Sequence, residues 1–424
     1  METQAIIFEK KYLQARVPLP SSKSLSNRWL VLAFLYGKKI HLENISDSED
    51  TLLMQDLLEK IEENEGEEKE ITLDCRNAGS VMRFLTAQVA FKSGIWILTG
   101  NERMQHRPIG SLVEALRGIG IRIDYLGEEA CPPMKIFGNE DILKTEISKI
   151  SVDASLSSQF VSALMLTSPL FPRGLHIEIL GEDKVSLPYI QMTAQIMRNG
   201  GLEVIFIDGS NIFIDGLLQL PSKIFVEADW TSASYLYTLL ALSEGGRIVL
   251  PNLCDDSLQG DRILSDWFED FGVETEFKRE EIIISKDPAW KPVQTSIREY
   301  DFTHHPDLAQ SIAVCCAALK LEVKLSGIYG LKFKETDRIM ALYNELVHIG
   351  VKVDLNEKES ELHLYPSVLE VKNVKIRTYG DHRMAMAFSV LAIQYPGIII
   401  EDMEVVKKSF PNYWNTLKLL GATV

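Results

Sequence analysis

One pattern recurs six times along this chain: a short cluster of polar or charged residues leads directly into a long apolar run. Such runs are typical of buried helices, and a regular spacing, here roughly 75 residues for most of the chain, is typical of repeated folding units. The clusters begin at Lys23, Asn77, Ser157, Thr231, His304 and Asp381. Because a helix start exposes backbone N–H groups and carries partial positive charge, the pattern predicts repeated helices whose starts can also bind anions.

A second pattern marks where other helices end. At five places an amphipathic stretch ends in Gly and an alternating apolar segment follows it; these glycines are Gly120, Gly201, Gly272, Gly350 and Gly421. Gly tolerates the left-handed backbone that ends many helices, and the Val and Ile residues that follow favour strands. A sixth stretch, residues 48–62, leads instead into the acidic segment 62–68, which we expect to be a solvated loop. Together the two patterns predict an α/β chain of six similar units.

The length of the chain predicts more than one domain. A chain of 424 residues exceeds what one hydrophobic core usually supports, so we expect two domains of about 200 residues, each with three units. The boundary is expected between the third and fourth units, near residues 225–229. No Ser-rich or Pro-rich linker occurs there, which favours a short, hinge-like connection.

Composition argues against several classes of protein. The formal net charge of −16 argues against nucleic-acid binding, because nucleic-acid-binding proteins carry basic faces. The five cysteines are odd in number and form no C-x-x-C pair, which is typical of a reduced protein, and no spacing indicates a metal site. Residues 1–4 do not begin a basic and then apolar leader, and no apolar run is long enough to span a bilayer. We therefore expect a soluble, cytoplasmic protein that binds no metal, nucleic acid or membrane.

Two of the polar clusters fit anion binding but also fit helix capping. Ser24 and Arg28 are four residues apart and share a helix face, where they can bridge a carboxylate. Taken alone, the pair is more typical of an N-cap serine beside a surface arginine. Ser157, Ser158 and Gln159 supply hydroxyls and free N–H groups that suit a phosphate, yet serines at a helix start are also common caps. Neither cluster alone distinguishes binding from capping.

The segment Lys334–Arg338 is the clearest candidate for acid–base chemistry. If Thr336 caps the helix that follows, Lys334 and Glu335 lie side by side at the N-terminal end of that helix. There the charge of a ligand can shift their pKa values. The alternative is a salt-bridged solvent face, which is the usual origin of charge patterns on helices. We favour a functional pair.

The last cluster places two potential cations, His382 and Arg383, at a helix start, which the helix dipole disfavours. A nearby anion must compensate, either a bound substrate or Asp381, the expected N-cap. Asp307 follows Pro306 in a first helical turn, where a carboxylate is expected for capping alone. The residue types by themselves leave open whether these groups bind a ligand.

Taken in order, the short motifs of the chain resemble those of the enolpyruvyl transferases, and among them the 5-enolpyruvylshikimate-3-phosphate synthases. Each motif is weak alone, but the ordered set runs through nearly the whole chain and is specific. The motifs begin at Ser22, Asn77, Glu102, Ser157, Pro188, Ser232, Gln259, Pro306, Lys334, Asp381 and Lys408. We therefore take the fold and chemistry of this family as expectations.

The resemblance implies two similar domains, each an inside-out α/β barrel of three β-α-β-α-β-β repeats, with a substrate cleft between them. Two crossing strands would join the domains. Residues 21–226 would form one domain and carry most of the acceptor site. Residues 1–20 and 227–424 would form the other, with the acid–base residues and most of the donor site. This division agrees with the boundary inferred from the repeats.

The resemblance also implies which residues bind the two substrates. The residues expected to contact the acceptor, shikimate 3-phosphate, are Lys23, Ser24, Arg28, Ser157, Ser158, Gln159, Ser186, Tyr189, Asp307 and Lys334. The residues expected to contact the donor, phosphoenolpyruvate, are Lys23, Asn77, Gly79, Arg107, Gln159, Arg338, Arg383 and Lys408.

The implied reaction is an addition followed by an elimination. The 5-hydroxyl of shikimate 3-phosphate attacks C2 of phosphoenolpyruvate while C3 is protonated, and the tetrahedral intermediate then loses phosphate and a proton. Asp307 and Lys334 are both candidates for handling the hydroxyl proton, and Glu335 is the candidate for the methylene proton. Lys23 and His382 complete the expected catalytic set. No metal or organic cofactor is needed for this chemistry.

Two alternatives stay open at this point. The related transferase that acts on UDP-N-acetylglucosamine shares the fold and the donor, but it usually carries a reactive Cys before an Arg-Pro pair, and residues 102–107 contain none. A non-catalytic anion-binding relative would not require a paired acid and base. The resemblance therefore favours a monomeric transferase of the shikimate pathway, which leads to chorismate and the aromatic amino acids.

Overall fold

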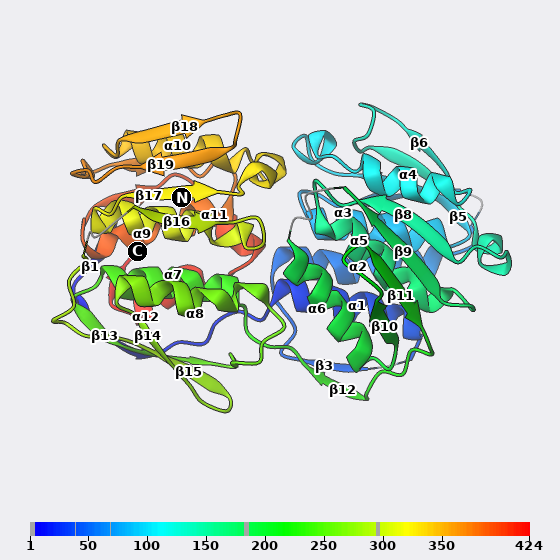
Figure 1. The fold of residues 1–424 in the computed structure, drawn as a ribbon, viewed down its shortest axis with the longest axis horizontal. Coiled ribbons are helices and arrows are strands. Elements are labelled where there is room, and N and C mark those ends of the chain that lie inside the picture. The colour runs from blue at the N-terminus through cyan, green and yellow to red at the C-terminus, as the bar shows by residue number, and fades with distance from the viewer. Residues whose placement is uncertain (1–4, 39, 68, 182–185, 294–296) are drawn as a thin grey trace. The chain divides into compact units, whose positions relative to one another are not determined.

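A computed structural model describes residues 5–38, 40–67, 69–181, 186–293 and 297–424 (Figure 1). Residues 1–4, for which no leader was predicted, and Glu68 of the acidic segment lie outside the described residues. The chain divides into two compact units. Unit 1 consists of Met1–Ser22 and Glu227–Val424, and unit 2 of Lys23–Val226.

Unit 1 shows the repeat most simply in one continuous stretch of chain. Its first two strands are parallel, and a hairpin then adds two antiparallel strands, in the order β16-β17-β19-β18. The elements of this repeat are β16 (Arg298–Asp301), α9 (Ala309–Leu319), β17 (Val323–Ser326), α10 (Arg338–His348), β18 (Val353–Asn356) and β19 (Glu361–Leu364). The predicted β-α-β-α-β-β unit is confirmed here.

The other two repeats of unit 1 are completed by strands from distant parts of the chain. One sheet has the order β14-β15-β13-β2 and the other β20-β21-β1-β22. The first repeat contains β2 (Tyr12–Arg16), α7 (Trp230–Leu242), β13 (Gly245–Pro251), α8 (Leu264–Trp267), β14 (Glu274–Phe277) and β15 (Glu281–Lys286). The second contains β20 (Lys375–Ile376), α11 (His382–Ser389), β21 (Ile398–Ile400), α12 (Tyr413–Leu419), β22 (Ala422–Thr423) and β1 (Ala5–Phe8).

Unit 2 contains two complete repeats, with sheets β4-β5-β7-β6 and β10-β11-β9-β8. The first contains β4 (Glu70–Asp74), α3 (Gly79–Ala90), β5 (Gly94–Thr99), α4 (Gly110–Gly118), β6 (Arg122–Tyr125) and β7 (Met134–Gly138). The second contains β8 (Lys149–Asp153), α5 (Ser158–Thr167), β9 (Leu175–Leu180), α6 (Leu187–Asn199), β10 (Glu203–Phe206) and β11 (Asn211–Asp215).

The third repeat of unit 2 is shorter. Its sheet pairs two parallel strands in the described part of the chain, β12 (Lys223–Phe225) and β3 (His41–Glu43), with helices α1 (Lys23–Tyr36) and α2 (Glu49–Asn64). The predicted acidic loop begins later than expected, because residues 62–64 belong to α2. Residues 65–67 are exposed and outside any helix or strand, as predicted.

The chain passes twice between the units, since β2 leads into α1 and β12 leads into α7. The two connecting segments are hydrogen-bonded to each other in unit 1. Ser22 N donates to Glu227 O at 2.8 Å, and Asp229 N donates to Pro20 O at 2.9 Å. Two segments therefore connect the units, as the resemblance implied.

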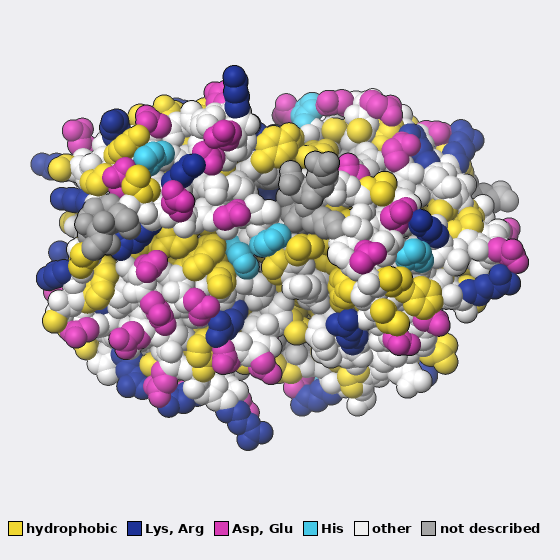
Figure 2. All heavy atoms as spheres, in the orientation of Figure 1, with side chains coloured by type: hydrophobic (Ala, Val, Ile, Leu, Met, Phe, Trp, Pro, Cys, Tyr) yellow, Lys and Arg dark blue, Asp and Glu magenta, His cyan; other side chains and the backbone are white. Residues whose placement is uncertain are grey.

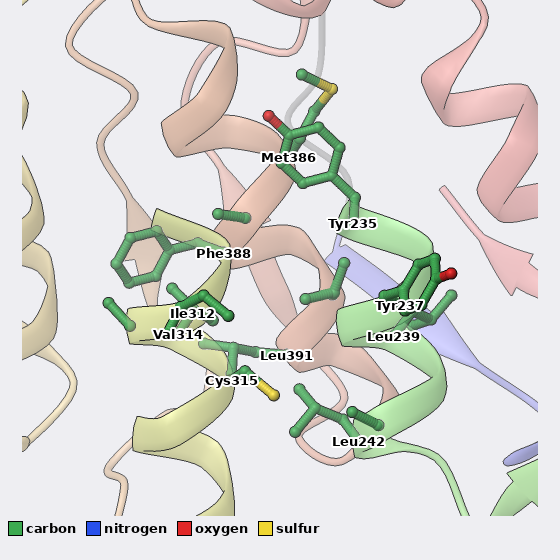
Figure 3. Packing of buried hydrophobic residues seen from close by; sticks show 14 of the residues in the cluster. Tyr235, Tyr237, Leu239, Leu242, Ile312, Val314, Cys315, Met386, Phe388 and Leu391 are labelled. Atoms are coloured by element: carbon green, nitrogen blue, oxygen red, sulfur yellow. The ribbon is translucent and has the colours of Figure 1, made fainter. Parts of the chain in front are cut away.

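The first helix of each repeat in unit 1 is buried on all sides, as expected for a helix that lies inside surrounding sheets. Every residue of α7 and of α11 is buried, and so is residue range 309–318 of α9. Figure 3 shows side chains of these three helices, among them Leu239, Ile312 and Phe388, packed in one apolar cluster. The polar clusters predicted from the sequence lie at the starts of these mainly apolar helices.

The five predicted helix-ending glycines all have positive φ, between 76° and 96°. Each is followed by a strand, which is β6, β10, β14 or β18 of a hairpin, or β22, which pairs with β1. An L side chain rarely adopts this backbone conformation, which explains the use of Gly. This prediction is confirmed.

The surface carries acidic and basic side chains side by side. On the face shown in Figure 2, Asp and Glu side chains are spread among Lys and Arg side chains. Within the described ranges, no helix combines the length and apolarity needed to cross a bilayer. All five cysteines are free thiols.

Candidate active site

The buried side chain of Arg338 lies at the centre of an ion-pair network in unit 1. Its Nε donates to Asp381 Oδ2 at 2.7 Å, its Nη1 to Asp307 Oδ1 at 3.0 Å and its Nη2 to Glu335 Oε2 at 2.7 Å. The side chain is only 1% exposed. Its three carboxylate partners come from the turn before α9, the loop before α10 and the residue before α11. One guanidinium therefore joins two of the predicted polar clusters, those that begin at His304 and Asp381, to the segment Lys334–Arg338.

Two more predicted cations extend this network. Arg383 Nη2 lies 2.8 Å from Asp307 Oδ2, and Lys408 Nζ lies 3.9 Å from Glu335 Oε1. Both side chains are buried. Buried charges are stable only when they are paired, and here carboxylates balance the cations. The structure thus brings together residues predicted to bind phosphoenolpyruvate and residues predicted to move protons.

His382 and Lys334 lie at the border of the network. His382 is 1% exposed, and its Nδ1 is 3.8 Å from Asp381 Oδ1. Lys334 directly precedes Glu335 and acts on the pKa of Asp307 through its charge. Four of the five predicted catalytic residues therefore belong to one cluster in unit 1, and the fifth, Lys23, belongs to unit 2.

The surrounding cations set the charge state of Asp307. Burial alone would raise the pKa of its carboxyl, but the charges of Arg383, Lys334 and Arg338 lower this pKa well below its usual range. Asp307 is therefore ionised at neutral pH. A carboxylate held in this way is a weak base, and an anion that attracted the guanidinium groups would raise its pKa and make it a stronger one.

The lowered pKa of Asp307 predicts a stability contribution that acid removes. Such a group stabilises the fold above its unfolded pKa, about 3.9, and the contribution is lost as pH falls through the folded value. We expect Asp307→Asn to destabilise unit 1 at pH 7 and to cost progressively less below about pH 4. Urea unfolding of both proteins from pH 7 to pH 3 measures this, and a cost that does not change with pH would contradict the ionised state.

Local capping explains how these side chains are held. Asp381 is the N-cap of α11, as predicted, since its Oδ1 accepts from Arg383 N at 2.8 Å. The predicted cap of α10 was wrong: Asp337, and not Thr336, accepts from Ile339 N and Met340 N, each at 3.1 Å. The helix begins one residue later than expected, and Asp is as good a cap as Thr. Lys334 and Glu335 still precede the helix start.

The helix that follows the fourth polar cluster contacts the network, although no ligand role was predicted for that cluster. The N-cap of α7 is Asp229, whose Oδ1 accepts from Ser232 N at 2.7 Å, while Thr231 donates to Asp261. One turn further along α7, the buried Tyr235 hydroxyl accepts a hydrogen bond from Arg383 Nη1 at 3.4 Å. Burial raises the pKa of Tyr235 to about 12, so the phenol is neutral.

In unit 2, Arg28, which is predicted to contact shikimate 3-phosphate, is a buried residue of α1. Its Nε donates to Thr193 Oγ1 at 2.7 Å and its Nη1 to the backbone oxygen of Ser24 at 2.9 Å. Burial lowers its pKa to about 10, so it remains charged at neutral pH. The ring of Tyr189 lies 5.9 Å from its guanidinium carbon. Ser24, Arg28 and Tyr189 are thus brought together, and Thr193 is a partner that sequence reasoning missed.

The start of α3 is lined by two buried guanidinium groups. Arg107 Nη1 donates to Asn77 O at 3.2 Å, and Arg83 Nη1 donates to Gly79 O at 3.1 Å and to Gln159 Oε1 at 3.2 Å. A Cβ on Gly79 would lie 2.5 Å from Arg107 Nη2 and 2.6 Å from Arg83 Nη1. Only Gly leaves room for both side chains at this helix start. Arg83 was not among the predicted site residues.

The remaining predicted residues of unit 2 lie at other helix starts. Ser157 caps α5 by accepting from Gln159 N at 3.2 Å, and Ser158 is buried beside it. Ser186 precedes α6 with a left-handed φ of 56°, a conformation that is unusual for a residue with a Cβ. Lys23 opens α1 and forms an ion pair with Asp50 Oδ2 at 2.8 Å. Ser157 therefore does cap a helix through its side chain, whereas Ser186 makes no side-chain cap hydrogen bond. All three serines lie at helix starts, where backbone N–H groups favour anions.

Solved structures share this fold. The EPSP synthase from Acinetobacter baumannii superposes with a TM-score of 0.72 at 20% identity, covering 99% of each chain. The enolpyruvyl transferase NikO from Streptomyces tendae gives a TM-score of 0.71 at 14% identity, covering 99% of this chain and 97% of that one. At these identities the likeness establishes the fold, two inside-out α/β domains.

Sequence comparison gives closer relatives. The 3-phosphoshikimate 1-carboxyvinyltransferase of Bacteroides fragilis (strain YCH46) is 39% identical over 411 residues, which is 96% of each chain. That of Sulfurovum sp. (strain NBC37-1) is 36% identical over 432 residues, covering 97% of this chain and 98% of the relative. The model of the EPSP synthase family matches residues 7–417. The charge network of unit 1 and the helix-start residues of unit 2 agree with this match. The chain therefore belongs to the EPSP synthase (3-phosphoshikimate 1-carboxyvinyltransferase) family.

Proposed function

We propose that this chain transfers the enolpyruvyl group of phosphoenolpyruvate to the 5-hydroxyl of shikimate 3-phosphate and releases phosphate. The observation that carries the proposal is the network around Arg338, where the donor-binding cations and the proton-transfer carboxylates of the family are connected through one side chain. The product belongs to the shikimate pathway, which supplies chorismate and the aromatic amino acids. The UDP-N-acetylglucosamine enzyme and a non-catalytic relative are not favoured, because the relatives are 3-phosphoshikimate 1-carboxyvinyltransferases.

The reaction begins with a change of partners in unit 1. The carboxylate and phosphate of phosphoenolpyruvate compete with Asp307 and Glu335 for the cations Arg338, Arg383 and Lys408. When the guanidinium groups turn towards the donor, the carboxylates lose their nearest positive charges, and their pKa values rise. Glu335 can then hold a proton at neutral pH, and Asp307 becomes a stronger base. Donor binding thus prepares both proton-transfer groups.

Addition and elimination then use the same two groups in opposite senses. The 5-hydroxyl of the acceptor gives its proton to Asp307 or Lys334 as its oxygen bonds to C2 of phosphoenolpyruvate, and Glu335 protonates C3. The tetrahedral intermediate expels phosphate, which takes up the proton held by Asp307 or Lys334, and Glu335 takes a proton back from C3 to restore the double bond. Lys23 and His382 stabilise the charge that develops on the phosphate and the transferring group.

Unit 2 provides most of the acceptor site in this proposal. Ser24, Arg28 and Tyr189 hold the carboxylate and ring of shikimate 3-phosphate. The 3-phosphate is held by Ser157, Ser158, Gln159 and Ser186, at helix starts where backbone N–H groups favour anions. Lys23, Asn77, Gly79, Arg107 and Gln159 contribute to donor binding. The division proposed is residues 21–226 for most of the acceptor site, and 1–20 with 227–424 for acid–base chemistry and most of the donor cations.

Phosphate release tests the choice of acceptor. Purified protein with phosphoenolpyruvate and shikimate 3-phosphate is expected to release phosphate, and to do so in the presence of EDTA. The same protein with UDP-N-acetylglucosamine in place of shikimate 3-phosphate is expected to release none. Turnover with only the nucleotide sugar would contradict the proposed acceptor, and no turnover with either would favour a binding protein.

Tyr235 is expected to position Arg383 for the donor. In Tyr235→Phe the hydrogen bond to Arg383 Nη1 is lost while the ring remains, so we expect KM for phosphoenolpyruvate to rise about two- to tenfold with little change in kcat. Tyr237→Phe is the matched control on the same helix, because its hydroxyl bonds Thr275 at 2.8 Å and not the network. Steady-state kinetics of both variants measure the effect. Equal KM values in the two variants would show that the phenol has no positioning role.

The cellular setting of the reaction is also a proposal. Five free cysteines, four of them buried, suit the reducing cytoplasm. We expect the protein to act there as a monomer, and size-exclusion chromatography with light scattering measures its mass in solution.

A further inference from the structure

Unit 1 contains a cavity at the C-terminal ends of two of its central helices, α7 and α9. A cavity of about 700 Å³ is lined by Leu242, the last residue of α7, and Leu319, the last residue of α9. Of the network residues, Asp307 precedes the other end of α9, and Tyr235 lies in the N-terminal half of α7. The volume is typical of pockets that bind small molecules. The cavity is therefore separate from the charge network and large enough for a ligand.

Four lysines line this cavity: Lys11, Lys286, Lys291 and Lys320. Glu244 is the one acidic residue in the lining. Across the described ranges, no ion pair joins any of these four lysines to a carboxylate. This is unusual in a chain whose net charge is −16. The cavity, which we call the lysine pocket, therefore has a local excess of positive charge that favours an anion.

Lys286 is the best-defined of the four cations. Its Nζ donates to Ser243 O at 2.8 Å and also to Ala241 O, at the C-terminal end of α7. An ammonium group has three donors, so one remains for a ligand. Burial lowers the pKa of Lys286, and the charge of Lys291 lowers it further. A bound anion would offset both effects.

One wall of the lysine pocket is flat and apolar. The ring of Trp290 lies 5.4 Å from Lys286 Nζ. The ring is fixed from one side, since a Cβ on Gly272 would lie 2.4 Å from its Cδ2 atom. Tyr12, which is 54% exposed, and Pro288 also line the cavity. Aromatic side chains of this kind stack on flat rings, and the cations beside them suit a negatively charged substituent on such a ring.

We propose that the lysine pocket binds a small aromatic carboxylate, with the carboxylate between Lys286 and Lys291 and the ring against Trp290. The inference does not rest on the proposed function, because no residue of the lysine pocket belongs to the charge network or to the helix starts of unit 2. Catalytic turnover and binding at this pocket can therefore be measured independently.

A titration of the full-length protein with 4-fluorobenzoate, followed by ¹⁹F NMR, tests this assignment. We expect saturable binding at or below about 1 mM. The double variant Lys291→Gln/Lys320→Gln is expected to weaken it about tenfold or more, since both side chains are exposed and make no hydrogen bond or ion pair in the described structure. The matched control is Lys144→Gln/Lys149→Gln, two exposed lysines of unit 2, which should bind like the unchanged protein.

Three results would overturn the proposal. One is the absence of saturable binding up to about 10 mM. Another is equal affinity of the two double variants, which would place the ligand elsewhere. The third is inorganic phosphate competing as well as benzoate does, which would mean that the lysines attract anions without selecting an aromatic ring. Binding that persists when shikimate 3-phosphate saturates the protein would support a site outside the acceptor site.

Discussion

Replacing Glu335 with Gln is expected to lower kcat by about 10²–10⁴-fold while KM for both substrates changes only a few-fold. The amide keeps the shape of the side chain and can still accept from Arg338 through its oxygen, but it cannot deliver a proton to C3 of phosphoenolpyruvate or take one back. Stopped-time phosphate release gives kcat, and equilibrium dialysis with shikimate 3-phosphate gives binding. The loss should therefore fall on turnover.

Glu345→Gln provides the matched control for this experiment. Glu345 is buried and lies within α10, the helix that Glu335 precedes. Its carboxylate accepts from Tyr379 Oη at 2.7 Å and from Arg377 N at 3.2 Å, and neither partner belongs to the network. We expect this variant to lose some stability and to keep its kcat. If Glu335→Gln retained kcat within a few-fold of the unchanged protein, Glu335 would not be the proton-transfer group.

The second large effect is expected on stability. Asp381→Ala removes the acceptor of Arg338 Nε and the cap of α11 in one change, and leaves a buried guanidinium with less compensation. We expect the free energy of unfolding of unit 1 to fall by about 3–5 kcal/mol. Urea unfolding followed by fluorescence reports on this unit through Trp230, Trp267, Trp290 and Trp414.

An exposed ion pair serves as the comparison for Asp381. Asp141 and Lys144 are 2.6 Å apart, and their side chains are 76% and 73% exposed. Asp141→Ala is expected to cost less than about 1 kcal/mol, because water solvates both charges when they separate. Similar small costs for Asp141→Ala and Asp381→Ala would mean that the network around Arg338 contributes little to the stability of unit 1.

The sequence predicts the repeats well because they depend on local chemistry. The helix starts at Lys23, Gly79 and Ser158 follow directly from polar clusters before apolar runs, and Gly120 and Gly350 end helices because of their positive φ. Which strands complete a repeat is not local. β2 and β1 join sheets formed largely by residues more than two hundred positions away, and no periodic pattern encodes that pairing.

The sequence also predicts most residues of the candidate site, but it does not predict which residues they contact. The family motifs name Arg338, Glu335 and Asp307, and the structure connects them. Asp381 was predicted as a cap and as one possible anion for His382 and Arg383, and the structure shows that it also accepts from Arg338. The partners Asp50, Thr193, Arg83 and Tyr235 come from elements that meet only in the folded chain. Spacing along the sequence carries no signal for such contacts.

The charges in unit 1 answer a question that the sequence left open. Cations at a helix start require an anion, and the sequence left open whether a substrate or Asp381 supplies it. The structure places three carboxylates, Asp307, Glu335 and Asp381, around Arg338. In the proposed mechanism a substrate anion exchanges places with these carboxylates, and donor binding changes their pKa values in this way.

Deuterium incorporation tests this account most directly. In D₂O, with phosphoenolpyruvate and shikimate 3-phosphate, addition through Glu335 forms a methyl group that contains one solvent deuteron, and elimination returns a methylene group that retains part of it. Mass spectrometry of the enolpyruvyl product is expected to show deuterium in the unchanged protein, and neither product nor label above background in Glu335→Gln. Product formed at full rate without deuterium would contradict addition and elimination at C3 and the role given to Glu335.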